Sequence, residues 1–233
     1  MRFFCVFAIV VSSIAAGSSA ADNLPKAGTT YSAQTRGLEV KGVLDLDVLF
    51  SSAHRSTVIG QDSGRVYSLE CTISVSKPDG PCDRYNGSVV SGALVTHFST
   101  QIEGDVPSHP TVMALLKDGG DATLAIAPNV PFFPLEAGKT VSWVQRWNNG
   151  ALYLRTVEQR YCVTQMVANL GTRELWEFKE TSRNLANEDN LPTGSGRHLY
   201  DPKIGLVVES RTILEQRKPP LHILRSVTQI TLP

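Results

Sequence analysis

The chain of 233 residues carries 22 lysines and arginines against 22 aspartates and glutamates, so its formal net charge at pH 7 is zero. A nucleic-acid-binding protein needs a basic face that neutralises phosphates, and this charge balance argues against that class. Hydrophobic residues make up 42% of the chain and charged residues 19%, which excludes the highly charged, weakly hydrophobic composition of a disordered protein. The length suits one β-rich domain or two small ones.

The N-terminus has the organisation of an export signal. Arg2 supplies a positive charge ahead of an apolar run, and residues 17–21 are the small residues that a signal peptidase requires. No second apolar run of about 18 residues follows, so we expect no transmembrane segment in the mature chain. We predict a cleaved signal peptide over residues 1–20 and a soluble, periplasmic mature protein that begins at Ala21 or Asp22.

β-Strands are predicted along most of the mature chain, because apolar and polar residues alternate with a period of two. The alternation starts at residues 44–50, where apolar side chains alternate with Asp45 and Asp47. No stretch of 12 residues shows the spacing of an amphipathic helix. We predict a mainly β fold, a curved antiparallel meander forming a half-barrel or a sandwich, with few helices. The further predicted strands are 65–75, 88–98, 111–116, 122–127, 140–147, 151–163, 162–168, 174–181, 197–200, 206–214 and 221–232.

Turn residues separate these strands. Asn149-Gly150 readily adopts the positive φ angles of a tight hairpin turn. Residues 60–64 predict another turn between two strands. We expect a single β-rich domain over residues 21–233, and the proline-rich segment 105–135 is where a boundary would fall if the chain held two.

The cysteines fit an exported protein. Cys5 leaves with the signal peptide, so three remain in the mature chain. Cys71 and Cys82 flank a segment that must turn, and a disulfide between them is the preferred pairing. A bridge from either one to Cys162 and the absence of any bridge stay open as alternatives. Cys162 lies in a predicted strand, where we expect a buried, reduced thiol.

Catalytic motifs are weak. Ser63 lies in an Asp-Ser-Gly sequence like that of chymotrypsin-like proteases, but His54 is only nine positions away, whereas that family draws the two residues from distant segments. Ser195 lies three residues before His198, but Thr193 and Arg197 stand where a nucleophile elbow needs glycines, so the loop before the predicted strand 197–200 is not catalytic by this motif. The histidines show no zinc-binding spacing. We therefore assign no catalytic residue, no metal ligand and no cofactor.

Large aromatic residues recur in pairs. Two pairs are spaced so that both rings face the same side of their strand, and a third pair lies in the proline-rich crossing. These rings either fill a core or line a cavity for an apolar ligand inside the curved sheet. The candidate ligand-binding residues are Trp143, Trp147, Trp176, Phe178, Phe132 and Phe133.

The C-terminal half resembles a known group of envelope proteins. Residues 200–208 read Tyr-Asp-Pro-Lys-Ile-Gly followed by an apolar strand, and residues 135–140 precede a strand that bears tryptophan. Over residues 135–232 the chain is similar to the periplasmic lipoprotein-localisation-factor-like group, which includes uncharacterised envelope β-sheet families. The resemblance implies an apolar half-barrel, which carriers of that group use to hold acyl chains beneath lid helices. This sequence shows no clear lid helices.

Three classes of function follow from these patterns. The first is an exported, non-catalytic binding or chaperone-like module of the envelope, with a lipid, another apolar ligand or a client protein as its partner. The alternative is a structural or protein-interaction component of the cell envelope, whose sheet edge docks a partner. The third is an enzyme without a recognisable motif.

Overall fold

The computed structural model describes residues 24–40, 46–62, 65–73, 84–91, 94–97, 101–103, 124–126, 129–146, 150–186 and 192–233. These segments form one 13-stranded sheet, which confirms the predicted antiparallel β meander. The only helical element in the described ranges is a single 3-10 turn, η3 (Ala168–Leu170). No helix in those ranges has the length and apolar character needed to cross a membrane.

The strands follow one another around the sheet with antiparallel pairing at every contact. Their order is β5-β4-β3-β2-β1-β13-β12-β11-β10-β9-β8-β7, with β6 paired to β4, so the first strand lies beside the last. The ends of this path, β5 and β7, do not pair within the described residues, and the sheet is open. The strands are β1 Thr30–Val40, β2 Leu46–Asp62, β3 Arg65–Ile73, β4 Arg84–Ser91, β5 Leu94–His97, β6 Gln101–Glu103, β7 Leu124–Ile126, β8 Thr140–Arg146, β9 Leu152–Met166, β10 Thr172–Asn184, β11 Gly194–Asp201, β12 Leu206–Leu214 and β13 Leu221–Thr231.

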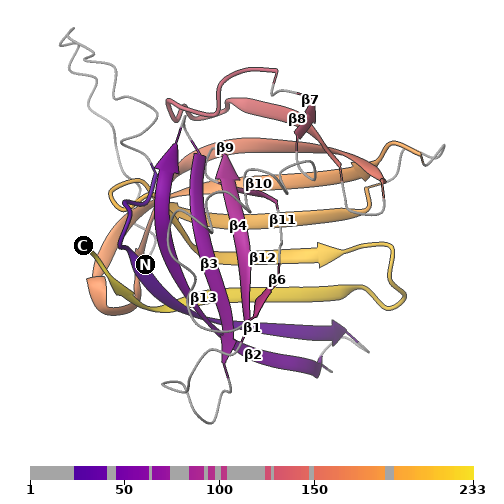
Figure 1. The fold of residues 1–233 in the computed structure, drawn as a ribbon. Coiled ribbons are helices and arrows are strands. Elements are labelled where there is room, and N and C mark those ends of the chain that lie inside the picture. The colour runs from indigo at the N-terminus through magenta and orange to yellow at the C-terminus, as the bar shows by residue number, and fades with distance from the viewer. Residues whose placement is uncertain are drawn as a thin grey trace, which may run out of the picture.

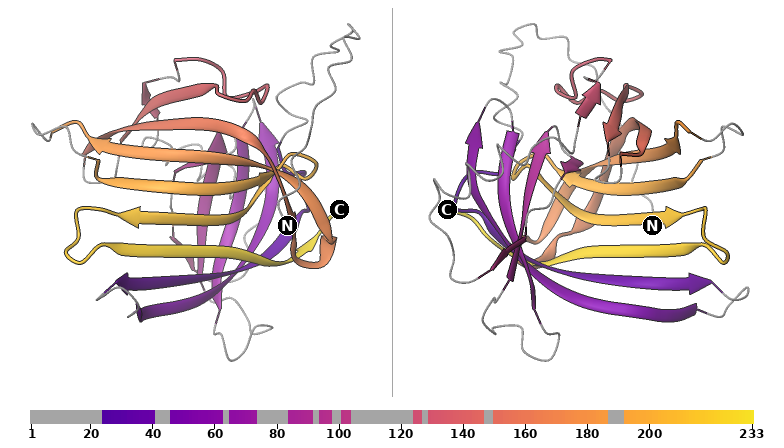
Figure 2. Two further views of the ribbon diagram at one scale, coloured as in Figure 1. Left: turned by 180° about the vertical axis from the view of Figure 1, so that it is seen from behind. Right: turned by 45° about the vertical axis from the view of Figure 1, so that its right-hand side comes forward.

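The sheet bends back over itself. Figure 1 shows β3 and β4 passing steeply across β9 to β13, and both views in Figure 2 agree. Register shifts leave one residue unpaired at Thr228 of β13 and at Leu49 and Ile59 of β2, and such bulges bend strands and increase their twist. The bend encloses one face of the sheet, which we call the inner face and which carries Val58, Val141 and Phe178.

A hydrophobic core on the inner face joins the two ends of the meander. Val58 of β2 and Val66 of β3 are fully buried against Val141 of β8 and Val157 of β9. Because these strands are far apart along the sheet, this contact requires the bend. Leu24, just ahead of β1, packs into the same core and closes it from the N-terminal side.

Two of the strand predictions differ from the structure. Two strands are predicted over residues 151–163 and 162–168, but they form the single strand β9, whose pairing with β10 continues past a register shift that skips Tyr161. The predicted strand 88–98 is instead a hairpin of β4 and β5. The predicted strand 111–116 lies outside the described residues, as do most residues of the expected boundary 105–135.

β1 was missed by sequence reasoning. Thr30–Val40 contains few apolar residues, so its period-two pattern is faint. It forms a strand because β2 and β13 pair with it on both sides and satisfy its backbone hydrogen-bonding groups. Two predicted turns are confirmed by pairing: Asp62 lies opposite Arg65, and Gly150, with φ of 80°, lies between the paired ends of β8 and β9.

The turn between β11 and β12 explains the Asp-Pro-Lys-Ile-Gly sequence. Asp201 is fully buried, accepts a hydrogen bond from the Lys203 backbone N–H at 2.9 Å and pairs with Arg173 of β10 at 2.8 Å. Gly205 has φ of +72°, and a Cβ there would come within 2.3 Å of the Leu24 backbone. The motif therefore closes a tight turn over which the N-terminal segment lies.

Candidate functional site

An aromatic cluster lies on the inner face, over β8, β10 and β11. Its rings touch edge to face or stacked: the Phe132 and Phe178 centroids are 5.3 Å apart, and Phe178 stacks on Tyr200 at 5.3 Å. Phe178 and Tyr200 are fully buried, whereas Phe132 and Trp176 are only partly buried at the border. The aromatic cluster consists of Phe132, Phe133, Trp143, Trp176, Phe178 and Tyr200.

The segment before β8 contributes two of these rings from outside the sheet. A buried glutamine holds this segment: Gln159 of β9 donates from its amide nitrogen to the Phe132 carbonyl at 2.7 Å and accepts from the Glu136 N–H at 2.9 Å. Lys139 donates to the Pro134 carbonyl at 2.8 Å. The segment is thus fixed by polar side chains while its phenyl rings enter the apolar core.

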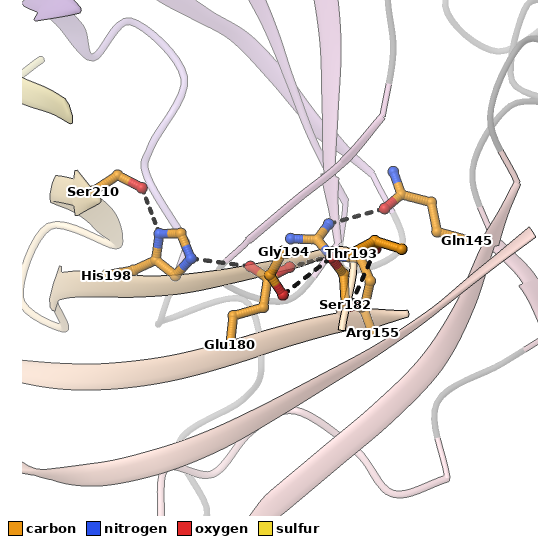
Figure 3. A network of polar contacts seen from close by, with 8 residues as sticks. All are labelled: Gln145, Arg155, Glu180, Ser182, Thr193, Gly194, His198 and Ser210. Carbon is orange, nitrogen blue, oxygen red and sulfur yellow. Dashed lines mark hydrogen bonds and ion pairs between the residues drawn. The ribbon is translucent and has the colours of Figure 1, made fainter. Parts of the chain in front are cut away.

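A chain of polar side chains lies on the same face as the aromatic cluster. Figure 3 shows the contacts within this chain. The Arg155 Nε donates to Glu180 at 2.6 Å, and an Arg155 terminal nitrogen donates to the Gln145 side-chain oxygen at 3.0 Å. His198 bonds through Nε2 to Glu180 at 3.0 Å and through Nδ1 to the Ser210 hydroxyl. Five adjacent strands, β8 to β12, each supply one member.

Arg155 also connects the polar chain to the aromatic cluster. Its guanidinium lies 5.2 Å from the centre of the Trp143 ring, a cation–π distance. Trp143 is 4% exposed, and its indole Nε1 has no hydrogen-bond partner in the part of the chain that the structure describes. A buried donor without a partner costs free energy unless another molecule supplies an acceptor.

Glu180 is held as a carboxylate. Burial by itself would raise its pKa, but the charge of Arg155 and the hydrogen bonds from His198 and Arg155 lower the pKa to about 2. Gly196 lies opposite Glu180 in the register, and a Cβ there would come within 2.7 Å of the His198 imidazole. The glycine therefore leaves room for His198 to reach across to the carboxylate.

A second set of similar residues lies on the other limb of the sheet. Arg225 of β13 pairs with Glu70 of β3, which also accepts from the Ser56 hydroxyl at 3.1 Å and lies 3.4 Å from His54. Tyr31 is hydrogen-bonded to Ser56 and Arg225. Burial, the largest single influence, would raise the pKa of Glu70, but the charge and hydrogen bond of Arg225 together with His54 and Ser56 lower the pKa below its usual value.

The two sets meet in the centre of the sheet. Ser210 is opposite His198 on one side and opposite Arg225 on the other, so all three side chains share the inner face. We call the combined row the polar belt. It contains Gln145, Arg155, Glu180, His198, Ser210, Arg225, Tyr31, Glu70, Ser56 and His54.

The order Ser210, His198, Glu180 is that of the groups in serine hydrolases. Ser210 lies inside β12, with β11 and β13 paired on its two sides, so its neighbouring backbone N–H groups are used in the sheet. A hydrolase needs such groups for an oxyanion, and this stretch of the described chain offers none. No three metal-binding side chains are grouped in the described ranges either. Ser210, His198 and Glu180 therefore form a hydrogen-bonded chain within the sheet.

The structure brings five of the six predicted aromatic residues into one cluster. Trp147, the sixth, lies outside the described residues, as does Cys82. Cys71 is buried on β3 and disulfide-bonded, and its partner is not among the described side chains. The Cys71–Cys82 pairing therefore stays a prediction, as does the state of Cys162.

Sequence reasoning missed the polar belt. It started the predicted strand only at residue 197, whereas residues 194–201 form β11, and it did not foresee that His198 is only 7% exposed. The sequence Gly-Ser-Gly has too few apolar side chains to predict a strand. A signal was present in β10, where Glu180 continues the every-second-residue row of Trp176 and Phe178. A carboxylate on an apolar row predicts a buried partner.

No protein-family model matches the sequence, and no curated protein does. Solved structures do resemble it. A protein with a YmcC-like fold from Bacteroides fragilis is 16% identical, with 89% of this chain and 98% of that one covered and a TM-score of 0.41. The hypothetical lipoprotein YmcC from Escherichia coli is 11% identical, with coverage of 91% and 89% and a TM-score of 0.35. A LolA superfamily protein from Nitrosomonas europaea is 9% identical, with coverage of 92% and 91% and a TM-score of 0.37. LolA is the lipoprotein localisation factor, so the neighbours include the group that the sequence resembled.

Proposed function

We propose that this chain is an exported, single-domain envelope protein that binds an apolar ligand, or an apolar segment of a client protein, on the inner face of its curved sheet. The aromatic cluster carries this proposal. Its border keeps Phe132 and Trp176 partly exposed, and Phe132 comes from a segment outside the sheet. A ligand that packs against these two rings would bury apolar surface worth roughly 25 cal/mol per Å².

The N-terminal sequence supports export to the periplasm. The arrangement of Arg2, an apolar run and small residues is that of a signal peptide. N-terminal sequencing of the exported protein should find Ala21 or Asp22 first. Retention of Met1 on the exported protein would contradict the proposal.

Binding is tested with N-phenyl-1-naphthylamine, a probe whose fluorescence rises in apolar surroundings. The wild-type protein should bind it saturably, and Phe132→Ala should change the Kd by at least about fivefold. Leu232→Ala, on an exposed leucine near the C-terminus, is the matched control and should leave the Kd unchanged. Absence of saturable binding by the wild type, or equal effects of both variants, would contradict an apolar site at the cluster.

A second candidate function, docking of an envelope protein, is supported by a different surface. Val48, Leu49 and Phe50 of β2 are consecutive and 61%, 45% and 43% exposed, so apolar side chains lie on both faces of this strand end. A photo-crosslinker at position 49 should then give a discrete adduct in the intact envelope, whereas one at position 232 should not. Equal crosslinking at both positions would contradict this function.

A further inference from the structure

We infer that the ligand of the inner face is an amphiphile with an uncharged, hydrogen-bonding head, such as a polyol or a sugar, and that the polar belt binds this head beside the aromatic cluster. The inference rests on the proposed function and specifies its ligand class. It is carried by the position of the belt, by its charge balance and by buried donors that the described protein leaves unpartnered.

The position of the belt makes the inner face amphipathic. The rows of aromatic and polar side chains lie on the same strands: in β10, Phe178 is followed on the same face by Glu180, and in β11, Tyr200 is preceded by His198. Arg155 bridges the two regions by its contact with the Trp143 ring. A molecule with an apolar part and a polar part therefore meets both kinds of surface within one or two residues along a strand.

The charge balance of the belt selects an uncharged head. Its two arginines are each paired with a carboxylate, Arg155 with Glu180 and Arg225 with Glu70. An anionic or cationic head would add an uncompensated charge to a set that is already neutralised, and such a charge is costly away from water. Hydroxyl and carbonyl groups add none.

Two buried atoms provide hydrogen bonds that the described protein does not use. The Trp143 Nε1 is a donor at the junction of cluster and belt, and the Thr35 hydroxyl lies opposite Arg225 on the same face. Neither has a hydrogen-bond partner among the described residues. The hydroxyl and carbonyl groups of an uncharged head are hydrogen-bonding partners of the kind that each of these atoms lacks.

Stability alone does not account for the belt. A buried ion pair can often be replaced by apolar residues without loss of stability, because desolvation offsets much of the attraction. Binding gives such a row of polar side chains a use, since a few precisely placed polar groups orient a ligand in an otherwise apolar site.

The test compares three surfactants with the same dodecyl tail, each below its micelle concentration: dodecyl glucoside, dodecyl sulfate and dodecyltrimethylammonium. Each displaces bound N-phenyl-1-naphthylamine, and the displacement gives its affinity. We expect dodecyl glucoside to bind at least fivefold more tightly than either charged surfactant. Equal affinities, or tighter binding of a charged head, would overturn the inference while the proposed apolar site would stand. Failure of the probe itself to bind would contradict the proposed function instead.

A variant that spares the fold sharpens this test. Thr35→Val removes a hydroxyl with no described partner and keeps the shape of the side chain, so stability should not fall. Its affinity for dodecyl glucoside should fall at least threefold, with the probe Kd unchanged. Thr181→Val, on the exposed side of β10, is the matched control and should leave both unchanged. Unchanged glucoside affinity in Thr35→Val would count against the Thr35 contact, and unchanged affinity in Trp143→Phe as well would overturn the inference.

Discussion

Glu180 and Glu70 have the same kinds of partner in different surroundings. Each carboxylate is paired with an arginine and contacts a histidine on the inner face; a serine is bonded to Glu70 itself in one set and to His198 in the other. The side chains of Glu180 and Arg155 are 11% and 14% exposed, whereas those of Glu70 and Arg225 are 24% and 31% exposed. The comparison shows that the burial of such an ion pair and the elements around it, rather than its residue types, determine how much it contributes to stability and to the ligand site.

The two sets also connect different parts of the fold. Glu70 and Arg225 are 155 residues apart in sequence and join β3 to β13 across two intervening strands. The Glu180 set lies on adjacent strands and contacts the aromatic cluster through Arg155. We therefore expect the Glu70 set to stabilise the bend of the sheet in addition to facing the ligand, and the Glu180 set to face the ligand beside the aromatic cluster.

The largest expected effect is a difference in stability between variants of the Arg155–Glu180 and Arg225–Glu70 ion pairs. Arg155→Leu leaves the buried Glu180 carboxylate without its cation and should lower the free energy of unfolding by about 3–5 kcal/mol. Arg225→Leu should cost about 1–2 kcal/mol, because water reaches the more exposed Glu70. Urea unfolding measures both. The double variant Arg155→Leu/Glu180→Leu is the control and should recover most of the loss, and an equal loss in the two single variants would contradict the difference.

The next largest effect is expected on stability at low pH, where Glu180 becomes protonated. Because the pKa of Glu180 is about 2 in the folded protein and 4.5 for an unperturbed glutamate, the carboxylate contributes stability above pH 4.5. That contribution is lost as the pH falls from 4.5 towards 2. Glu180→Gln should show a flatter acid unfolding curve than Glu70→Gln when both are followed by circular dichroism. Parallel acid unfolding curves for the two variants would contradict a larger acid-dependent contribution of Glu180 to stability.

A smaller effect is expected near neutral pH on the Glu70 side. Burial lowers the pKa of His54, the charge of Glu70 opposes this, and Arg225 adds to the lowering. The folded protein therefore prefers neutral His54, and its contribution to stability is lost as the pH falls below the ordinary value of 6.5. His54→Gln should remove this loss between pH 7 and 5. A His54 resonance that titrates above 6.5 in an NMR experiment would reverse the sign.

The smallest expected effect concerns the disulfide of Cys71, the residue that follows Glu70 on β3. We expect non-reducing peptide mapping to join Cys71 to Cys82 and to leave Cys162 as a thiol. Such a link would tie down the chain just beyond the Glu70 set. A peptide that joins Cys71 to Cys162 would instead link β3 to β9 and disprove the predicted pairing.

Much of the fold could be predicted because its rules are local. Period-two alternation located most strands, and Asn149-Gly150 located a hairpin, since both depend on neighbouring residues alone. β1 could not be predicted in the same way. Its residues are mostly polar, and only its two partner strands, one of them near the C-terminus, make it a strand.

The candidate site, like the fold, could be predicted from the sequence only in part. Paired aromatics predicted five members of the cluster, because large apolar side chains gather wherever a sheet is enclosed. The polar belt could not be foreseen, since Glu180 meets His198 across strands, and Glu70 meets Arg225 only after the sheet bends. Partners of this kind depend on register and curvature, which no short motif records.

Native mass spectrometry of the protein purified from its own envelope tests the central claim most directly. The account predicts a population that carries a retained small molecule, released by mild activation, whose fragments show an alkyl or acyl chain joined to an uncharged head. Phe132→Ala should reduce that population, and Leu232→Ala should not. A spectrum of the bare mature chain alone, or with only a second protein chain attached, would contradict a ligand-binding inner face.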